Sequence, residues 1–159
     1  MKRVLIGFLF RVDFDLRPGG RSGPLIPTVD QFVDYYGTYG ETWERLAFVR
    51  FTEIAGNQDM VSEALQFARK FTFRKHLDYT LLDDLKQLRG KIHAQHAGHD
   101  ADAWDLKLGV GGIRDIELFV HALQVIHGGK STLLQTKGTG LALQIIQETK
   151  VLPVADSQF

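Results

Sequence analysis

Apolar residues follow two different periods along this chain, and the change falls close to residue 27. Between Arg11 and Arg17, apolar and charged residues alternate, as they do on a β-strand whose two faces differ. From Thr28 onward, apolar residues recur every three or four positions, which is the spacing of one face of an α-helix. The pattern predicts a mainly α fold, in which a helical bundle follows a partial β-strand and loop.

Six helices are expected in the bundle. Thr28 and Gln31 form a capping-box pattern at the start of the first helix, and Gly56 is expected to stop the second. The fifth helix is the most apolar, so we expect it to be mostly buried. The expected ranges are 28–37, 41–55, 59–73, 80–97, 113–127 and 138–151.

The predicted strand presents apolar and charged residues on opposite faces. The apolar face is expected to point towards a core, and the charged face carries two carboxylates bracketed by two guanidinium groups. Such a face can hold a hard divalent cation and the phosphate oxygens that it neutralises. The alternative is the solvated face of an edge strand, which the pattern alone favours. The apolar residues are Val12, Phe14 and Leu16, and the charged residues are Arg11, Asp13, Asp15 and Arg17.

A glycine-rich basic loop follows this strand. Pro18 cannot donate to a sheet, so the strand is expected to end there. Gly19, Gly20 and Gly23 allow backbone amides to approach an anion, and Arg21 adds positive charge. The loop is therefore a candidate phosphate-binding segment.

Composition narrows the classes of function. The chain has 159 residues, of which 44% are hydrophobic and 24% charged, a profile typical of a globular domain. Lys plus Arg and Asp plus Glu number 19 each, so no net charge attracts nucleic acid or an anionic membrane. Cysteine is absent, which removes disulfides and thiolate metal sites and is compatible with a cytoplasmic location.

The start of the fifth helix offers a second candidate site. The glycine turn at 109–112 either binds an anion through free amides or simply seats the helix, and Lys107 just before it can reach a phosphate. Within the helix, four polar residues form one stripe, which either meets solvent or lines a cleft. The stripe consists of Arg114, Glu117, His121 and Gln124.

Two further groups are assigned structural roles. His93, His96 and His99 are not expected to converge on zinc, because Gly98 ends the helix before the third histidine. Aromatic residues on the apolar helix faces are expected to belong to the core and not to a base-stacking platform. These aromatic residues are Trp43, Tyr35, Tyr36, Phe71 and Phe73.

Several motifs, in order, resemble those of the glutamine synthetase adenylyltransferase family. The segment R-V-D-F-D-L-R-P-G-G-R-S-G-P-L at 11–25 is similar to that family's R-V-D-x-R-L-R-P-x-G-x-S-G-P-L signature. The segment K-L-G-V-G-G-I-R-D-I-E at 107–117 closely matches its K-L-G-x-G-G-I-R-D/E-I-E block. The match continues with the paired tyrosines and T-W-E-R at 42–45, with F-R-K-H-L-D at 73–78 and with L-Q-V-I-H-G-G at 123–129.

The resemblance implies a nucleotidyltransferase that uses Mg²⁺ and ATP or ADP to add or remove AMP on glutamine synthetase. Asp13 matches the family's third metal carboxylate and is the expected catalytic residue, with Asp15 as a second candidate metal ligand. Asp15 stands where the family usually has arginine, which leaves its role in doubt. The expected nucleotide- or phosphate-binding residues are Arg11, Arg17, Arg21 and Lys107.

The resemblance also implies how the chain divides into domains and which half of the family it matches. Residues 1–27 correspond to the end of a nucleotidyltransferase-like α+β domain, and residues 28–159 to a helical bundle. The 107–117 and 123–129 blocks are more similar to the N-terminal, deadenylylating half of the family. No segment here matches its upstream S-D-x-D carboxylates, so an inactive fragment is expected.

Two alternatives to an enzyme of this kind stay open. One is a non-catalytic helical module that contacts glutamine synthetase or a PII-type signal protein. The other is the related PII uridylyltransferase, against which the W-E-R and G-G-I-R-D-I-E segments argue.

Overall fold

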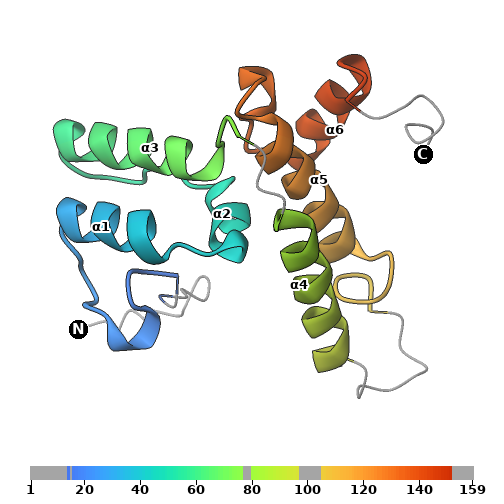
Figure 1. Ribbon diagram of the computed structural model, residues 1–159, viewed down its shortest axis with the longest axis horizontal. Helices are drawn as coiled ribbons and strands as arrows, with labels where there is room; N and C mark the ends of the chain where they lie inside the picture. The colour runs from blue at the N-terminus through green and yellow to red at the C-terminus, as the bar shows by residue number, and fades with distance from the viewer. Residues whose placement is uncertain (1–13, 15, 77–79, 97–104, 152–159) are drawn as a thin grey trace, which may run out of the picture.

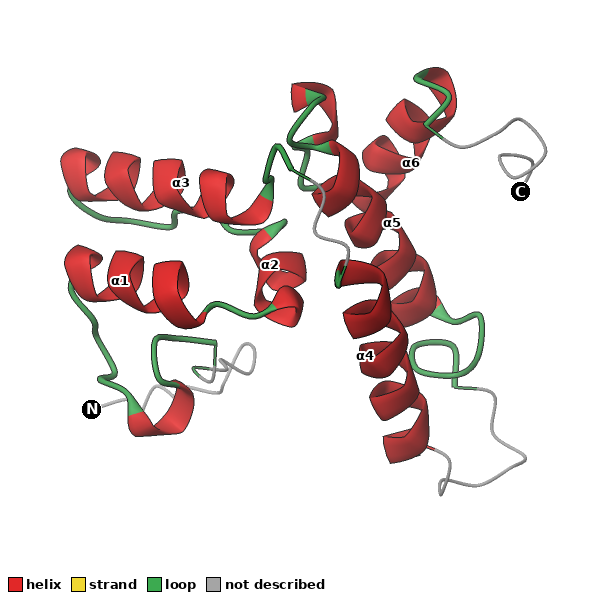
Figure 2. Ribbon diagram, viewed as in Figure 1, coloured by secondary structure: helices red, strands yellow, loops and turns green. Residues whose placement is uncertain are grey.

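The computed structural model describes Phe14 and residues 16–76, 80–96 and 105–151. Within these residues the protein is helical, with six α-helices, two short 3-10 helices and no strand (Figure 2). The α-helices are α1 (Val29–Tyr39), α2 (Thr42–Phe48), α3 (Gln58–Thr72), α4 (Leu81–His96), α5 (Ile113–His127) and α6 (Thr139–Glu148). The 3-10 helices are η1 (Gly20–Ser22) and η2 (Thr132–Leu134). The mainly helical fold is confirmed.

Five of the six predicted helices form close to their expected ranges. The capping box is present at α1, where the Gln31 amide donates to the Thr28 hydroxyl and the Thr28 amide donates to the Gln31 side chain. Asn57 caps α3 by accepting from the amides of Asp59 and Met60. Side-chain caps of this kind satisfy amides that have no partner inside the helix, which fixes where the helices begin.

The prediction for the second helix is wrong beyond Phe48. The amides of Val49, Arg50 and Phe51 donate to carbonyls three residues earlier, so the last turn tightens and the helix ends. Phe51 then stacks on Phe32 of α1, with ring centroids 5.7 Å apart. Aromatic packing between helices thus overrides the local helical pattern that extended to Ala55.

The helices form two groups that α2 joins. α1 and α3 lie side by side, while α5 packs against α6 and η2 follows α5 (Figure 1). α2 contacts α3, α4 and α5, and so connects the two groups. α2, which the apolar spacing predicted to be longer than it is, is therefore the centre of the described fold.

Three apolar clusters correspond to these groups. An aromatic cluster between α1, α2 and α3 contains the buried residues Tyr36, Phe48 and Phe71. An aliphatic cluster between α5, η2 and α6 surrounds Val120 and Leu134. The third cluster joins α2, α4 and α5 through Leu46, Val49, Leu81 and Val125.

The structure corrects two predictions about apolar residues. Phe14 and Leu16 were expected to face a core, yet both are exposed, because the described residues form no sheet against which a strand face packs. Trp43, which was expected in the core, is 43% exposed beside the start of α2. Its indole N–H donates to the Glu41 carboxylate over 2.7 Å, which holds the ring at the surface.

Candidate functional site

The predicted catalytic face lies largely outside the described residues. This holds for Arg11, Asp13 and Asp15. Arg17 is described, and its guanidinium donates to the carbonyl of Phe14 over 2.5 Å and to that of Arg21 over 3.5 Å. Arg17 therefore ties the backbone at Phe14 to the loop, whereas its Nε is buried and has no hydrogen-bond partner in the part of the chain that the structure describes.

The backbone of the glycine-rich loop is closed by its own hydrogen bonds. The amides of Gly20, Ser22 and Gly23 donate to carbonyls of residues 17, 19 and 20. Gly23 packs so closely that an added Cβ would lie 1.8 Å from the Pro18 carbonyl oxygen, so only glycine fits there. These amides are occupied, so side-chain charge from Arg17 and Arg21 is what the loop offers an anion.

The turn before α5 is likewise built from internal bonds. The amides of Gly109 and Gly112 donate to Asp105 and Gly109 carbonyls, and the Gly111 amide donates to the Asp115 carboxylate over 3.0 Å. The amide of Ile113 donates to the carbonyl of Leu106. This arrangement favours the interpretation of a turn that seats the helix, because these amides are not available to an anion.

Lys107 lies in this turn and is exposed. Its amide donates to the Asp105 carboxylate, and its carbonyl accepts from the amide of Arg114. The turn and the N-terminal loop lie on opposite sides of the α4 and α5 pair (Figure 1). The structure therefore does not bring Lys107 together with Arg17 and Arg21.

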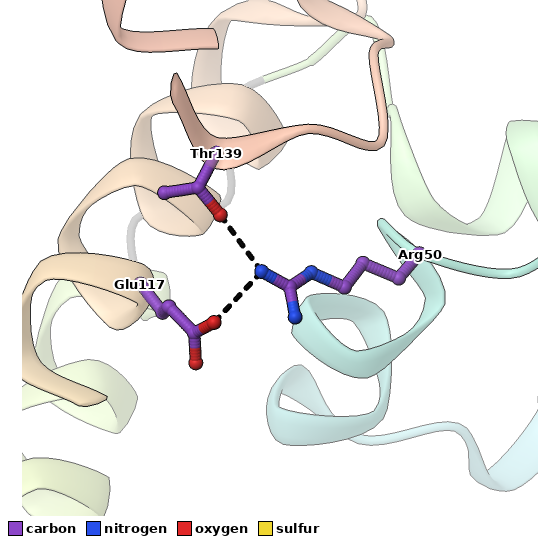
Figure 3. Close-up of polar contacts among 3 residues, drawn as sticks. All are labelled: Arg50, Glu117 and Thr139. Carbon is purple, nitrogen blue, oxygen red and sulfur yellow. Dashed lines mark hydrogen bonds and ion pairs between the residues drawn. The ribbon is translucent and has the colours of Figure 1, made fainter. Parts of the chain in front are cut away.

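The polar stripe of α5 meets the other helices at a junction. One nitrogen of Arg50 donates to the Glu117 carboxylate over 2.8 Å and to the Thr139 hydroxyl over 2.7 Å (Figure 3). These three residues come from the segment after α2, from α5 and from the start of α6. The Arg50 and Glu117 side chains are 46% and 28% exposed, so the ion pair orients the helices more than it stabilises them.

His121 lies beside this ion pair on α5. Burial, with a smaller contribution from the Arg50 charge, lowers the pKa of its imidazole, while Glu117 acts in the opposite direction. Its Nε2 atom is buried, and no described residue forms a hydrogen bond with it. The structure therefore favours a neutral imidazole at this position.

Gln124 completes the stripe inside the protein. It is 1% exposed, and its side-chain nitrogen donates to the carbonyls of Leu134 and Thr136, each over 2.7 Å. Neither interpretation describes the whole stripe: it meets solvent at Arg114 and then runs into the packing between α5, η2 and α6, where Gln124 is buried.

The T-W-E-R segment has structural contacts of the same kind. Glu44 is buried and accepts from the amide of Glu41, and burial raises the pKa of the Glu44 carboxyl despite that bond. Arg45 is also buried and donates to the carbonyl of Thr72 at the end of α3. Glu44 therefore caps the start of its own helix, while Arg45 ties α2 to the end of α3.

A groove of about 380 Å³ lies between the start of α2 and α4. Trp43, Glu41 and Lys91 line it, together with Asp84, whose carboxylate accepts from the Thr42 hydroxyl. Among the described residues, no group of three or more His, Asp or Glu side chains is placed to hold a metal ion. The side chains of His93, His96 and His99 lie outside the described residues, as do the predicted magnesium ligands.

Sequence reasoning missed the residues that tie distant helices together. Arg50 and Thr139 were given no role, and neither was Arg89, which pairs with Asp115 over 3.2 Å. The partners lie 26 to 89 positions apart, and no local pattern indicates such a contact.

Comparison with known proteins identifies the sequences that this chain resembles. Residues 2–67 match the model of a family described as glutamate-ammonia ligase adenylyltransferase, and residues 86–158 match that of the PII-uridylyltransferase family. Three curated relatives carry the name bifunctional glutamine synthetase adenylyltransferase/adenylyl-removing enzyme. The protein from Rhizobium meliloti is 39% identical over 90% of this chain. Those from Thioalkalivibrio sulfidiphilus and Nitrosococcus oceani are 36% and 35% identical over 92% and 96% of it.

The matched region is a small part of each relative. The chain spans 15% of the Rhizobium and Thioalkalivibrio proteins and 16% of the Nitrosococcus protein. The resemblance drawn from the motifs is confirmed, because nearly the whole chain aligns with these relatives. None of the helices that the structure describes is both long and apolar enough to cross a lipid bilayer.

Proposed function

This chain corresponds to a segment of the glutamine synthetase adenylyltransferase family, and from that premise we propose that it takes part in the transfer of AMP to or from a tyrosine of glutamine synthetase. The observation that carries the proposal is 35–39% identity to three such enzymes over at least 90% of the chain. The process regulates nitrogen assimilation in the cytoplasm, with PII-type signal proteins as a second class of partner.

We assign the chemistry to the N-terminal segment. Asp13 is the proposed catalytic metal ligand, with Asp15 beside it, and Mg²⁺ would neutralise and align the phosphate oxygens of ATP or ADP. Arg17, with Arg11 and Arg21, would hold the phosphates through charge. The buried Nε of Arg17, which has no hydrogen-bond partner among the described residues, is one observation in favour, because a donor of this kind costs free energy until an acceptor reaches it.

We favour the deadenylylating direction, in which AMP leaves the modified tyrosine by phosphorolysis. The motifs at 107–117 and 123–129 support this choice, as they are closer to that half of the resembled family. The 159 residues contain no S-D-x-D segment, so we propose that this polypeptide alone is inactive.

A chimera tests the proposal. This chain replaces the aligned segment of the Rhizobium meliloti enzyme, and both AMP addition to glutamine synthetase and AMP removal from the modified enzyme are measured. We expect the chimera to retain activity, and a version that lacks the segment to have none. A well-folded chimera without either activity would contradict the proposal. Robust AMP removal by the 159 residues alone would contradict the proposed inactivity.

The second candidate function is an interaction module. It is favoured by the exposed apolar residues of α5, such as Ile116 and Phe119, which are 48% and 43% exposed. Surface plasmon resonance of the chain against glutamine synthetase and a PII-type protein distinguishes the two. Nucleotide binding without binding to either protein would favour the enzymatic proposal.

A further inference from the structure

An apolar surface extends over α4, α5 and the turn before α5. Its six residues are large and are each more than two-fifths exposed. We call it the α5 surface: Leu82, Leu106, Val110, Ile113, Ile116 and Phe119, with exposures of 55%, 67%, 82%, 55%, 48% and 43%. Ile113, Ile116 and Phe119 are spaced three residues apart, so they lie on neighbouring parts of one helix face.

Two hollows lie in this surface. One, of about 420 Å³, lies along the junction of α4 and α5 and is lined by Leu85, Leu118 and Phe119. The other, of about 540 Å³, lies between the turn and the start of α5 and is lined by Ile113 and Ile116. α4 and α5 are in contact beneath the first hollow, where Leu81 packs with Val125 and Arg89 pairs with Asp115. The two hollows are therefore surface depressions of a size that side chains of a further helix can fill.

The exposed apolar residues of the α5 surface are clustered, unlike single apolar residues exposed elsewhere on a protein. Ile54 is 98% exposed, but it lies alone in the loop between α2 and α3, where a single apolar residue needs no explanation. Clustered exposure around a groove is instead typical of an interaction site. The sequence agrees, since α5 is apolar on most of its faces and its described neighbours cover only part of it.

Charges at the rim indicate the chemistry of the occupant. Lys86 and Arg89 border the groove on the α4 side, and Lys107 and Arg114 are exposed on the turn and at the start of α5. Of the nearby carboxylates, Asp105 lines the second hollow and accepts from the amides of Lys107 and Leu108, and Asp115 is engaged by Arg89 and by the Gly111 amide. The Lys86–Asp83 contact, at 3.5 Å with both side chains more than 70% exposed, is weak. The rim therefore favours negative charge.

We propose that the α5 surface binds an amphipathic helix of a partner protein, with an aliphatic stripe in the groove and acidic residues on both flanks. The stripe would occupy the two hollows, and the acidic flanks would meet Lys86 on one side and Lys107 and Arg114 on the other. This proposal deepens the second candidate function and does not depend on any nucleotide chemistry.

A designed peptide tests it. The probe is a fluorescently labelled 18-residue helical peptide with leucines at i, i+3, i+4 and i+7 spacing and glutamates on its flanks. A matched peptide has lysine in place of each glutamate. Fluorescence anisotropy with the 159-residue chain is expected to show binding of the acidic peptide, weakened by salt, and binding of the basic peptide at least about tenfold weaker.

Three variants of the chain sharpen the result. Phe119→Glu is expected to weaken binding of the acidic peptide at least about tenfold, because it places a charge in the groove. Lys86→Glu is expected to narrow the preference between the two peptides. Ile54→Glu, at an isolated exposed site, is the matched control and should leave binding unchanged, and circular dichroism checks that each variant is helical.

Several outcomes would overturn the proposal. These are equal or tighter binding of the basic peptide, no binding of either peptide, and no effect of Phe119→Glu in a folded variant. A dimer in sedimentation experiments that Phe119→Glu dissociates would assign the surface to a second copy of the chain. None of these readouts involves AMP transfer, so failure here is distinct from failure of the enzymatic proposal.

Discussion

The two helical groups of this protein bury apolar residues in different ways. α1, α2 and α3 surround an aromatic cluster in which some rings meet edge to face, as Tyr36 and Phe48 do at 4.8 Å, and others stack, as Phe32 and Phe51 do. α5, η2 and α6 enclose an aliphatic cluster and rely on Gln124 to tie η2 to α5. In the first group Tyr39, Trp43 and Met60 are exposed on three different helices, whereas Ile113, Ile116 and Phe119 of the second group are exposed along one helix, α5. The contrast indicates that the second group is the one built to meet another element.

The largest expected effect is in the aromatic cluster. Phe48 is 5% exposed and contacts Phe32, Tyr36, Phe51 and Phe71. Phe48→Ala is therefore expected to lower the free energy of unfolding by about 3–5 kcal/mol. Urea denaturation measures this, with the surface variant Ile54→Ala as control. A loss below about 1 kcal/mol would show that the cluster is not the core of the first group.

The next effect probes the second group. Gln124→Ala removes two hydrogen bonds and leaves the carbonyls of Leu134 and Thr136 without those donors. We expect a loss of about 2–3 kcal/mol. Gln66→Ala, at an exposed position of α3, is the matched control and should change stability by less than about 0.5 kcal/mol. Equal effects of the two substitutions would refute the role given to Gln124.

A smaller effect of opposite sign is expected at Tyr36. Its side chain is 1% exposed, its hydroxyl has no hydrogen-bond partner within the described ranges, and burial raises the pKa of that phenol. Tyr36→Phe keeps the ring contacts and removes the unsatisfied hydroxyl, so we expect a gain of about 1 kcal/mol in thermal or urea unfolding. Marked destabilisation would reveal a partner for the hydroxyl.

The smallest effect depends on pH. Because the pKa of His121 is lower in the folded protein than the ordinary value of 6.5, the unfolded chain takes up a proton first as pH falls. The contribution of neutral His121 to the free energy of unfolding is complete above pH 6.5. It is lost as the pH falls from 6.5 towards the lower pKa of the folded state. His121→Gln should flatten the decline in urea midpoint between pH 7.5 and 5.5. An unchanged slope would place the titration elsewhere, with His127, whose pKa burial also lowers, as the first alternative.

The helices were predictable where local signals decide them. The Thr28 capping box and the apolar spacing of α3 and α5 act within a few residues, so their bounds follow from the sequence. α2 was not predictable, because Phe51 leaves the helical path to stack on Phe32, which lies nineteen positions earlier. Trp43 was placed in the core on its spacing alone, whereas its bond to Glu41 holds it at the surface.

The candidate site was predictable only in part. Motif blocks identify which segments matter, and 107–117 does supply Asp115 and Glu117 to the junctions between helices. The partners Arg50, Arg89 and Thr139 come from other helices and connecting segments, and their contacts depend on tertiary packing that no periodicity encodes. The catalytic assignment of Asp13 rests on resemblance and stays a prediction.

The most direct test of the enzymatic account is the rate at which the chimera releases AMP from modified glutamine synthetase, measured with Asp13→Asn. We expect that substitution to reduce the rate by at least about 100-fold, since loss of a metal carboxylate removes several kcal/mol of transition-state stabilisation. Asp34→Asn, at an exposed position of α1, is the matched control and should leave the rate unchanged. An Asp13→Asn chimera that releases AMP as fast as the unsubstituted chimera would contradict the account.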